Sequence, residues 1–424
     1  MKKSKRTISL LLLVVLLAGA LSGCKGTKSD SGKIEIELVQ YKPEAVKAFE
    51  AIEEKFNATH DNIHLTIDSP NDAMTILKTR FIREDNPDII GIGGDVNYSN
   101  FVDSDMMMDI SDFDGLDTIK QAYLDIDKNL EFVPEEGVYA VPYMANAAGI
   151  LYNKDIFDEH GWKIPNTWSE FIALCDEIQK AGIQPFTFGF KDTWTCLAPW
   201  NAIAVDLAPA DVCQQVNGGE TTFTEEYREV SERMLALLPY GPEDPFAYNY
   251  NDACTAFANG ESAMYTIGSY AVPQIKSVNP EMNIDSFVFP AAEKAEDNSL
   301  NSGCDLQFSV MADCENKEAA YEVLRFLLED ENIQIYIDDQ TAVPCKEGDF
   351  ELPSILDGMA SYIQEGRMKD YQDHYYPSEM AVDAQIQTFL MKKDVDAFLK
   401  KFDTDWIRYN RDIIRKVEEY NKNH

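Results

Sequence analysis

Aromatic, amide and acidic side chains occur together in loops that follow expected strands. Gln40, Tyr41 and Glu44 occupy the first loop between a strand and a helix, and Trp194 stands in the polar stretch KDTWT after a strand-like run. Aromatic rings stack on the apolar C–H faces of a sugar ring, and carboxylates and amides hydrogen-bond its hydroxyls. These residue types therefore favour a binding site for a neutral carbohydrate. A role for Trp194 in anchoring its own loop is the alternative.

Three further side chains are candidates for the same site because of where they stand along the chain. Asn146 follows the segment VPYM at 141–144, which we expect to pass from one half of the protein to the other. Tyr375 and Tyr376 come just before a helix that starts near Pro377, and their rings would cover the far side of the site. Packing of these halves themselves is the alternative for the two tyrosines.

The first hundred residues predict the scaffold that positions these side chains. Ile34, Ile36 and Leu38 alternate with polar residues, which is typical of a strand, and Pro43 stands where the first turn of a helix begins. The next expected elements are a strand at 63–67, a helix at 72–83 and a strand at 88–93. Alternating strands and helices indicate a parallel α/β sheet, whose ligands bind at the carboxyl ends of the strands. The loops 40–44 and 93–100 are therefore the ones expected to carry the site.

The first 24 residues resemble the leader of a bacterial lipoprotein. A basic start, MKKSKR, precedes an apolar stretch at 8–20, which is short for a membrane span, and LSGC then ends at Cys24. The resemblance implies a signal peptide at 1–23 and a lipidated Cys24 that inserts into the lipid bilayer. Residues 24–33 would be a polar tether, and the body would face outside the cytoplasm at the cell membrane. An uncleaved anchor and a plain secreted form are the alternatives.

Composition excludes several other classes of function. The chain has 37 Lys and Arg residues against 74 Asp and Glu, a net charge of −37, so nucleic acid is not an expected partner. His60 and His64 fall around a strand pattern rather than on one helical face, and no metal or other cofactor is expected. Seven cysteines remain beyond Cys24, an odd number without a CxxC pair, and we predict no particular disulfide.

Six sequence blocks, in this order and spacing, resemble the extracellular solute-binding proteins of family 1. These are maltose-binding-protein-like substrate-binding lipoproteins of ABC sugar importers. The blocks are VPY at 141–143, GILYNK at 149–154, PNTWSEF at 165–171, AFANGESAMY at 256–265, GSY at 268–270 and AVP at 342–344. The resemblance covers residues 33 to 424. Tyr270 departs from the pattern, because the family commonly has Trp at that position.

The resemblance implies an α/β fold of the periplasmic-binding-protein type. Two α/β lobes with parallel-type sheets would be joined by a multi-strand hinge, with the ligand cleft between them. The N-terminal lobe would comprise residues 34–143 and 298–344, and the C-terminal lobe residues 144–297 and 345–424. The chain would cross between lobes near 141–144, 296–302 and 342–345, so that the lobes close around the ligand by bending.

The resemblance also adds site residues and partners. Tyr270 matches a ring-stacking position, and Asp95 matches a position where the family often places a carboxylate against hydroxyls, although a turn-forming role suits Asp95 as well. The implied function is to bind a neutral sugar or oligosaccharide and deliver it to ABC permease subunits, as a monomer and without catalysis. A secreted glycoside hydrolase is the alternative from another class. A binding lipoprotein for a non-sugar solute such as a peptide is a third possibility.

Overall fold

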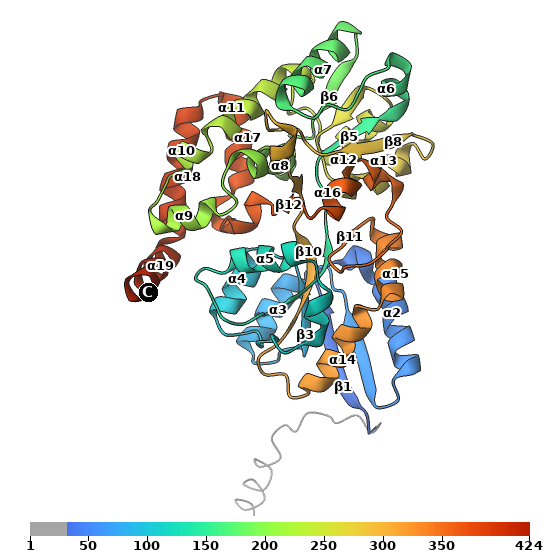
Figure 1. Cartoon of the computed structure of the whole chain (residues 1–424), viewed down its shortest axis with the longest axis vertical. Coiled ribbons are helices and arrows are strands. Elements are labelled where there is room, and N and C mark those ends of the chain that lie inside the picture. Colours follow the sequence, from blue (N-terminus) through green and yellow to red (C-terminus); the bar gives the residue numbers. More distant parts are fainter. Residues whose placement is uncertain (1–31) are drawn as a thin grey trace, which may run out of the picture.

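The computed structural model describes residues 32–424, which form two bodies of helices and strands, one above the other in Figure 1. The predicted signal peptide and the lipidation site at Cys24 lie outside these residues. Within residues 32–424, no helix is both long and apolar enough to cross a membrane.

The lower body is built on a six-stranded sheet, called the first sheet here, with the strand order β11-β4-β10-β3-β1-β2. Its strands are β1 (Ile34–Gln40), β2 (Ile63–Asp68), β3 (Ile89–Ile92), β4 (Val141–Ala145), β10 (Cys304–Val310) and β11 (Val343–Pro344). The parallel pairing of β1 with β2 and β3 confirms the three strands predicted at the start of the chain. β10 runs antiparallel to both of its neighbours, and β11 runs antiparallel to β4. The predicted α/β class is thus confirmed, with a mixed sheet.

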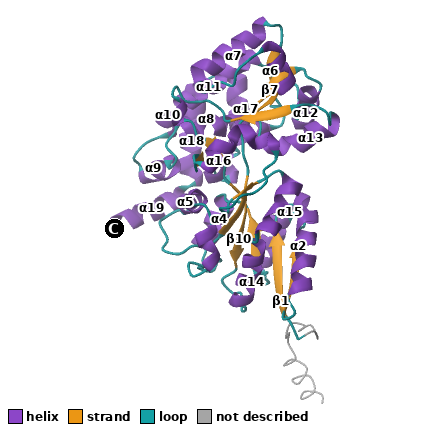
Figure 2. Cartoon of the chain, turned by 45° about the vertical axis from the view of Figure 1, so that its right-hand side comes forward, coloured by secondary structure: helices purple, strands orange, loops and turns teal. Residues whose placement is uncertain are grey.

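The mixed order has a simple cause. β1, β2 and β3 are parallel because each is joined to the next by a strand–helix–strand crossover. β10 enters the first sheet from the other body, and β11 enters it after the late helix at 330–340, so neither strand has to be parallel to its neighbour. Six helices accompany the first sheet: α2 (Val46–Thr59), α3 (Ala73–Ile82), α4 (Val96–Asp103), α5 (Gln121–Leu130), α14 (Lys317–Leu327) and α15 (Asp330–Gln340). Figure 2 shows these helices around the strands of the lower body.

The upper body is built on a four-stranded sheet, the second sheet, with the order β6-β7-β5-β8. Its strands are β5 (Ile150–Asn153), β6 (Gln184–Thr187), β7 (Ser262–Tyr265) and β8 (Ile284–Phe287), and a separate pair joins β9 (Leu300–Asn301) to β12 (Met368–Lys369). The remaining α-helices are α6 (Lys154–His160), α7 (Trp168–Lys180), α8 (Leu197–Leu207), α9 (Val212–Gly218), α10 (Phe223–Glu226), α11 (Arg228–Leu237), α12 (Tyr250–Ala258), α13 (Val272–Val278), α16 (Ala360–Gln364), α17 (Val382–Lys392), α18 (Val395–Tyr409) and α19 (Arg411–Asn423). We call the elements around the first sheet the first lobe and those around the second sheet the second lobe.

Two clusters of buried apolar side chains stabilise the lobes. The larger cluster is centred on the first sheet and continues through the crossing strands to α12 and α13. The smaller cluster lies between the second sheet and the C-terminal helices, where Trp200, Phe402 and Trp406 are fully or almost fully buried. All seven cysteines in residues 32–424 are free thiols, and six of them are buried.

The chain passes between the lobes at three places. It leaves the first sheet after β4, returns between β8 and β10, and leaves again after β11. β4 lies between β10 and β11 in the first sheet, so the three connections start from adjacent strands. Adjacent connections of this kind permit bending of one lobe against the other. The domain boundaries given above stay a prediction.

Helices of the two lobes also touch away from these strands. Lys416 on α19 forms an ion pair with Asp103 on α4, and the side chain of Gln214 on α9 donates a hydrogen bond to the backbone oxygen of Asn129 on α5. α9 and α19 belong to the second lobe, and Figure 2 shows α19 beside α4 and α5. The lobes are therefore held in their present arrangement by contacts other than the three connections.

Candidate ligand-binding site

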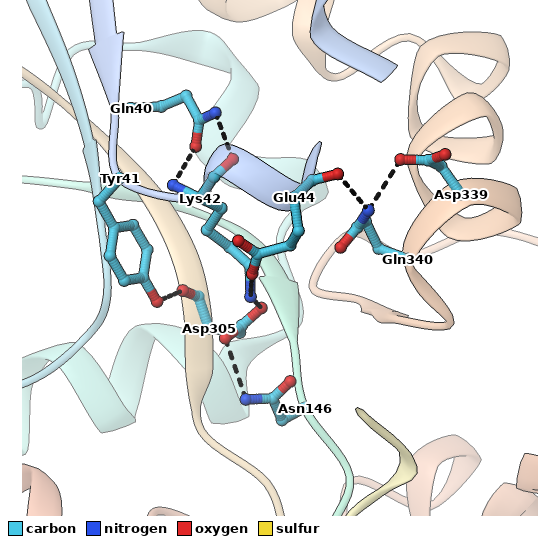
Figure 3. A network of polar contacts seen from close by, with 8 residues as sticks. All are labelled: Gln40, Tyr41, Lys42, Glu44, Asn146, Asp305, Asp339 and Gln340. Carbon is cyan, nitrogen blue, oxygen red and sulfur yellow. Dashed lines mark hydrogen bonds and ion pairs between the residues drawn. The ribbon is translucent and has the colours of Figure 1, made fainter. Parts of the chain in front are cut away.

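Asp305 is the centre of a polar network at the junction of the lobes (Figure 3). Its carboxylate oxygen Oδ2 lies 2.5 Å from Nζ of Lys42, and its Oδ1 accepts a hydrogen bond of 3.0 Å from Nδ2 of Asn146. The hydroxyl of Tyr41 donates to the backbone oxygen of Asp305 at 2.5 Å. The network thus joins the loop after β1, the residue after β4 and the second residue of β10.

Gln40 and Glu44 contribute to this loop in different ways. Gln40 is fully buried, and its amide closes the turn: Nε2 donates to the backbone oxygen of Lys42 at 2.8 Å and to the hydroxyl of Ser69 at 2.6 Å. Its Oε1 accepts from the backbone N–H of Lys42 at 2.6 Å. Glu44 is exposed, 3.3 Å from the Lys42 ammonium, and its backbone oxygen accepts from Gln340. Gln40 therefore shapes the loop, whereas Glu44 lies at its rim.

The charges around Asp305 fix the protonation of its neighbours. Burial lowers the pKa of Lys42, but the carboxylates of Asp305 and Glu44 outweigh burial and raise it, so the ammonium stays charged. Burial raises the pKa of the Tyr41 phenol well above its ordinary value, and the carboxylates of Asp305, Asp95 and Glu44 raise it further. Tyr41 is therefore a neutral hydroxyl that lies within electrostatic reach of Asp95.

Asp95 forms the N-terminal cap of α4, as the turn-forming alternative predicts. Its Oδ1 accepts hydrogen bonds from the backbone N–H of Asn97 at 2.7 Å and from the Asn97 side chain at 3.0 Å. The preceding residue, Gly94, donates its N–H to the backbone oxygen of Cys304 at 2.8 Å. This bond ties the Asp95 loop to β10, beside Asp305.

Three aromatic rings form a second group, on the second lobe. The ring centroid of Trp194 lies 5.0 Å from that of Tyr250 and 6.3 Å from that of Tyr270. Trp194 is 40% exposed and Tyr270 is 37% exposed. Large aromatic faces that stay open to water and adjoin one another are typical of binding surfaces. The structure therefore brings together the two aromatic residues predicted for the site and adds Tyr250.

Short contacts place this aromatic group next to the connections between the lobes. The backbone N–H of Ser269 donates to the backbone oxygen of Ala147 at 3.0 Å, one residue beyond Asn146. Gly268 has no room for a Cβ because the Tyr270 ring lies against it. Protein atoms surround the partly exposed Tyr270 phenol closely enough that burial raises its pKa. The Tyr270 ring thus packs against Gly268 and stays partly open to water.

The two tyrosines before Pro377 take different places. Tyr375 is half-buried and packs against both apolar clusters. Tyr376 is 5% exposed, its hydroxyl donates to that of Tyr227 at 2.8 Å, and it accepts from the Trp200 indole at 3.2 Å. The structure therefore places Tyr376 in the core of the second lobe, as the packing alternative expects, because its ring and its hydroxyl are both used there.

Sequence reasoning missed several residues of this region. Lys42 stands in the predicted loop, but its residue type alone does not show that its ammonium turns inward to Asp305. Asp305 reaches the site only because β10 pairs with β3 and β4, which are distant in sequence. Tyr371 is also close to the site only through tertiary structure. Burial raises the pKa of its phenol, and Tyr270 of the second lobe and Asp305 of the first lobe raise it further. Tyr371 therefore lies within electrostatic reach of the aromatic group and of the Asp305 network. Within residues 32–424, no three His, Cys, Asp or Glu side chains are placed to hold a metal ion.

Residues 40–334 match the bacterial extracellular solute-binding protein family. The match covers more than half of the chain and includes both groups of site residues. It ends before β12 and the segment that follows β12. The chain therefore belongs to the bacterial extracellular solute-binding proteins, as the sequence blocks predicted. The family consists of binding proteins, not enzymes.

Two relatives of established name match most of the chain. The multiple sugar-binding protein of Streptococcus mutans is 28% identical over 346 residues, which is 78% of this chain and 81% of the relative. The melibiose/raffinose/stachyose-binding protein MelE of Bacillus subtilis is 21% identical over 395 residues, which is 88% of each chain.

Solved structures confirm the two-lobe fold. The apo form of RafE from Streptococcus pneumoniae has a TM-score of 0.79 at 24% identity, covering 89% of this chain and 98% of that one. RafE in complex with raffinose has a TM-score of 0.71 at 25% identity, covering 88% and 98%.

Proposed function

We propose that this protein is the substrate-binding lipoprotein of an ABC importer and that it binds a neutral sugar or oligosaccharide between its lobes. The observation that carries the proposal is the pairing of an open aromatic surface, Trp194 and Tyr270, with the hydroxyl-binding groups around Asp305. The rings suit the apolar faces of a sugar, and the polar groups suit its rim. The names of the relatives, which refer to several sugars, support this ligand class.

The polar network argues against the two alternatives. A glycoside hydrolase needs two carboxylates on either side of the bond that breaks, one of them an acid held ready to give up a proton. Both carboxylate oxygens of Asp305 instead accept contacts from Lys42 and Asn146. A peptide ligand needs charged groups for its termini, but the ammonium of Lys42 is already neutralised by Asp305 and Glu44. We therefore propose that the ligand is neutral and that the protein releases it chemically unchanged.

The division of the site between the lobes supports a closing mechanism. Tyr41, Asp95 and Asp305 belong to the first lobe, whereas Trp194 and Tyr270 belong to the second. A ligand that touches both groups binds the closed form more tightly and shifts the population toward it. The membrane permease would recognise the closed form by the outer surfaces of the lobes. We propose that Cys24 anchors the protein in the bilayer and that it acts as a monomer.

A thermal-shift experiment tests the proposal. The protein is heated with galactose, melibiose, raffinose, stachyose or diacetylchitobiose, with glycine-terminated peptides as the comparison. A ligand at 100 times its dissociation constant adds about 2.7 kcal/mol to the free energy of unfolding, so a true ligand raises Tm measurably. We expect at least one sugar to do so and to be recovered intact by chromatography. Stabilisation by peptides alone, or cleavage of the sugar in excess over protein, would contradict the proposal.

A further inference from the structure

The hydroxyl of Tyr371 is buried and has no hydrogen-bond partner among residues 32–424. Tyr371 is 8% exposed, and its hydroxyl is one of the few buried side-chain polar atoms of the described chain that remain unpaired. A buried hydroxyl without a partner loses its hydrogen bonds to water and gains none in return, which destabilises the fold. Buried polar groups in native proteins are nearly always paired, so an unpaired one needs an explanation.

The position of Tyr371 supplies that explanation. The charges that act on its phenol come from both halves of the site, with Tyr270 on the second lobe and Asp305 on the first. Tyr371 follows β12, which pairs with β9 on the connection between β8 and β10. The tyrosine therefore lies within electrostatic reach of both the aromatic group and the Asp305 network, and its ring lies beside Gly303, two residues before Asp305.

The segment that carries Tyr371 is held rigidly. The side chains of Asp370 and His374 form an ion pair of 2.7 Å, and the Asp370 side chain is only 4% exposed. Oδ1 of Asp370 also accepts the backbone N–H of Tyr371 at 2.8 Å. Burial lowers the pKa of His374, but Asp370, Asp373 and Asp95 outweigh it and raise the pKa to about 10, so the imidazole stays charged at neutral pH.

Gly303 allows this segment to approach β10. A Cβ at position 303 would collide with Oδ1 of Asp370 and would come within 2.8 Å of the His374 ring and 3.0 Å of the Tyr371 ring. The backbone oxygen of Gly303 accepts the N–H of Asn146 at 3.3 Å, which connects the same spot to the Asp305 network. A glycine here lets the polar segment 370–374 pack closely against the backbone that leads into β10.

We propose that the Tyr371 hydroxyl hydrogen-bonds a hydroxyl or ring oxygen of the bound sugar and helps to select it. This inference rests on the proposed function and adds to it a third wall, formed by residues 370–374. In the empty protein the hydroxyl is kept unpaired by its rigid segment. Ligand binding supplies the missing partner, so the energetic penalty is relieved only in the complex.

The test is Tyr371→Phe, which removes the hydroxyl and keeps the ring. The matched control is Tyr376→Phe, because the Tyr376 hydroxyl is equally buried but is paired within the core. Affinity for the sugar that gives the largest thermal shift among galactose, melibiose, raffinose, stachyose and diacetylchitobiose is measured by calorimetry, and Tm is measured without sugar. We expect Tyr371→Phe to weaken binding about tenfold while Tm of the empty protein stays the same or rises. We expect Tyr376→Phe to lower Tm and leave the affinity unchanged.

The outcomes separate this inference from the proposed function. If the wild-type protein binds a sugar and Tyr371→Phe binds it equally well, the role of Tyr371 is wrong and the proposed function stands. If Tyr371→Phe lowers Tm of the empty protein as Tyr376→Phe does, the hydroxyl is paired in the folded protein and the inference also fails. If the wild-type protein binds none of the five sugars, the proposed function fails and takes this inference with it.

Discussion

The two halves of the candidate site are built in opposite ways. On the first lobe, Tyr41, Lys42 and Asn146 all contact Asp305, and the side chains of Lys42 and Asp305 are only 14% and 11% exposed. On the second lobe, Trp194 and Tyr270 touch one another and keep more than a third of their surface open to water. One half is an interlocked polar network, and the other is an open apolar surface.

Because of this difference, the polar half should contribute mainly to the stability of the fold and the aromatic half mainly to ligand affinity. A buried ion pair contributes little net stability, but removal of one partner leaves a buried charge and is costly. The exposed part of a ring contributes nothing to folding and is removed from water only when a ligand covers it. Substitutions in the polar half should therefore affect folding first, and substitutions in the aromatic half should affect affinity alone.

The largest effect is expected at the polar half. Asp305→Ala leaves the Lys42 ammonium buried without its nearest carboxylate, so the free energy of unfolding should fall by about 3 kcal/mol. Denaturant unfolding of the empty protein measures this loss. Replacement of both charges, Lys42→Met with Asp305→Leu, should recover most of the stability without restoring sugar binding. A double variant as unstable as the single one would show that Asp305 stabilises the fold through other contacts.

A smaller effect is expected at the aromatic half. Trp194→Ala and Tyr270→Ala should each weaken sugar binding by about 1–3 kcal/mol, because each removes a ring that would stack on the ligand, while Tm of the empty protein stays nearly constant. Calorimetric titration measures the affinity. Tyr409→Ala is the matched control, since Tyr409 is 38% exposed at the end of α18. Wild-type affinity in both site variants would mark these rings as ordinary surface residues.

The smallest effect is expected between the lobes. The Lys416–Asp103 ion pair stabilises the arrangement of the lobes in which it occurs. Lys416→Met should therefore shift the balance between arrangements and change sugar affinity by at most about fivefold at low salt, because partly exposed pairs are worth under about 1 kcal/mol. Small-angle scattering should show a changed radius of gyration in the variant, and 1 M salt should remove the difference.

Lys401→Met is the control for this variant. Lys401 pairs with Asp405 four residues along the same helix, so its loss removes a similar ion pair without touching the first lobe. An equal change in affinity for both variants would point to net charge rather than to the contact between lobes.

Local patterns carried the fold prediction. Ile36 and Leu38 are buried, as the alternation predicts, whereas Ile34 at the start of the strand is exposed. Pro43 does begin the short helical turn before α2. The family blocks then gave the two-lobe architecture. The antiparallel direction of β10 could not be predicted in this way, because pairing between distant segments leaves no local pattern.

The role of the site residues in binding stays a prediction. Trp194 is a candidate because an aromatic residue in a polar loop is unusual, Tyr41 because it lies in the first loop between a strand and a helix, and Tyr270 because it matches a ring-stacking position of the family. Gln40 was assigned to the ligand although its amide is used by its own turn, since residue type alone does not show which way a side chain points. The sequence does not distinguish Tyr371 from Tyr375 and Tyr376 as a ligand-binding residue, because only tertiary structure shows which hydroxyl of this segment is unpaired.

The central position of β10 also sets the order in which the chain can fold. β10 pairs with β3 and β4, yet it is synthesised after every strand of the second sheet. The first lobe therefore cannot complete its sheet until β10 and β11 have emerged, well after β4, and pairings between such distant segments form slowly. For a chain exported through a leader such as the one predicted at residues 1–23, this delay lengthens the time during which it remains unfolded enough to be threaded through a membrane.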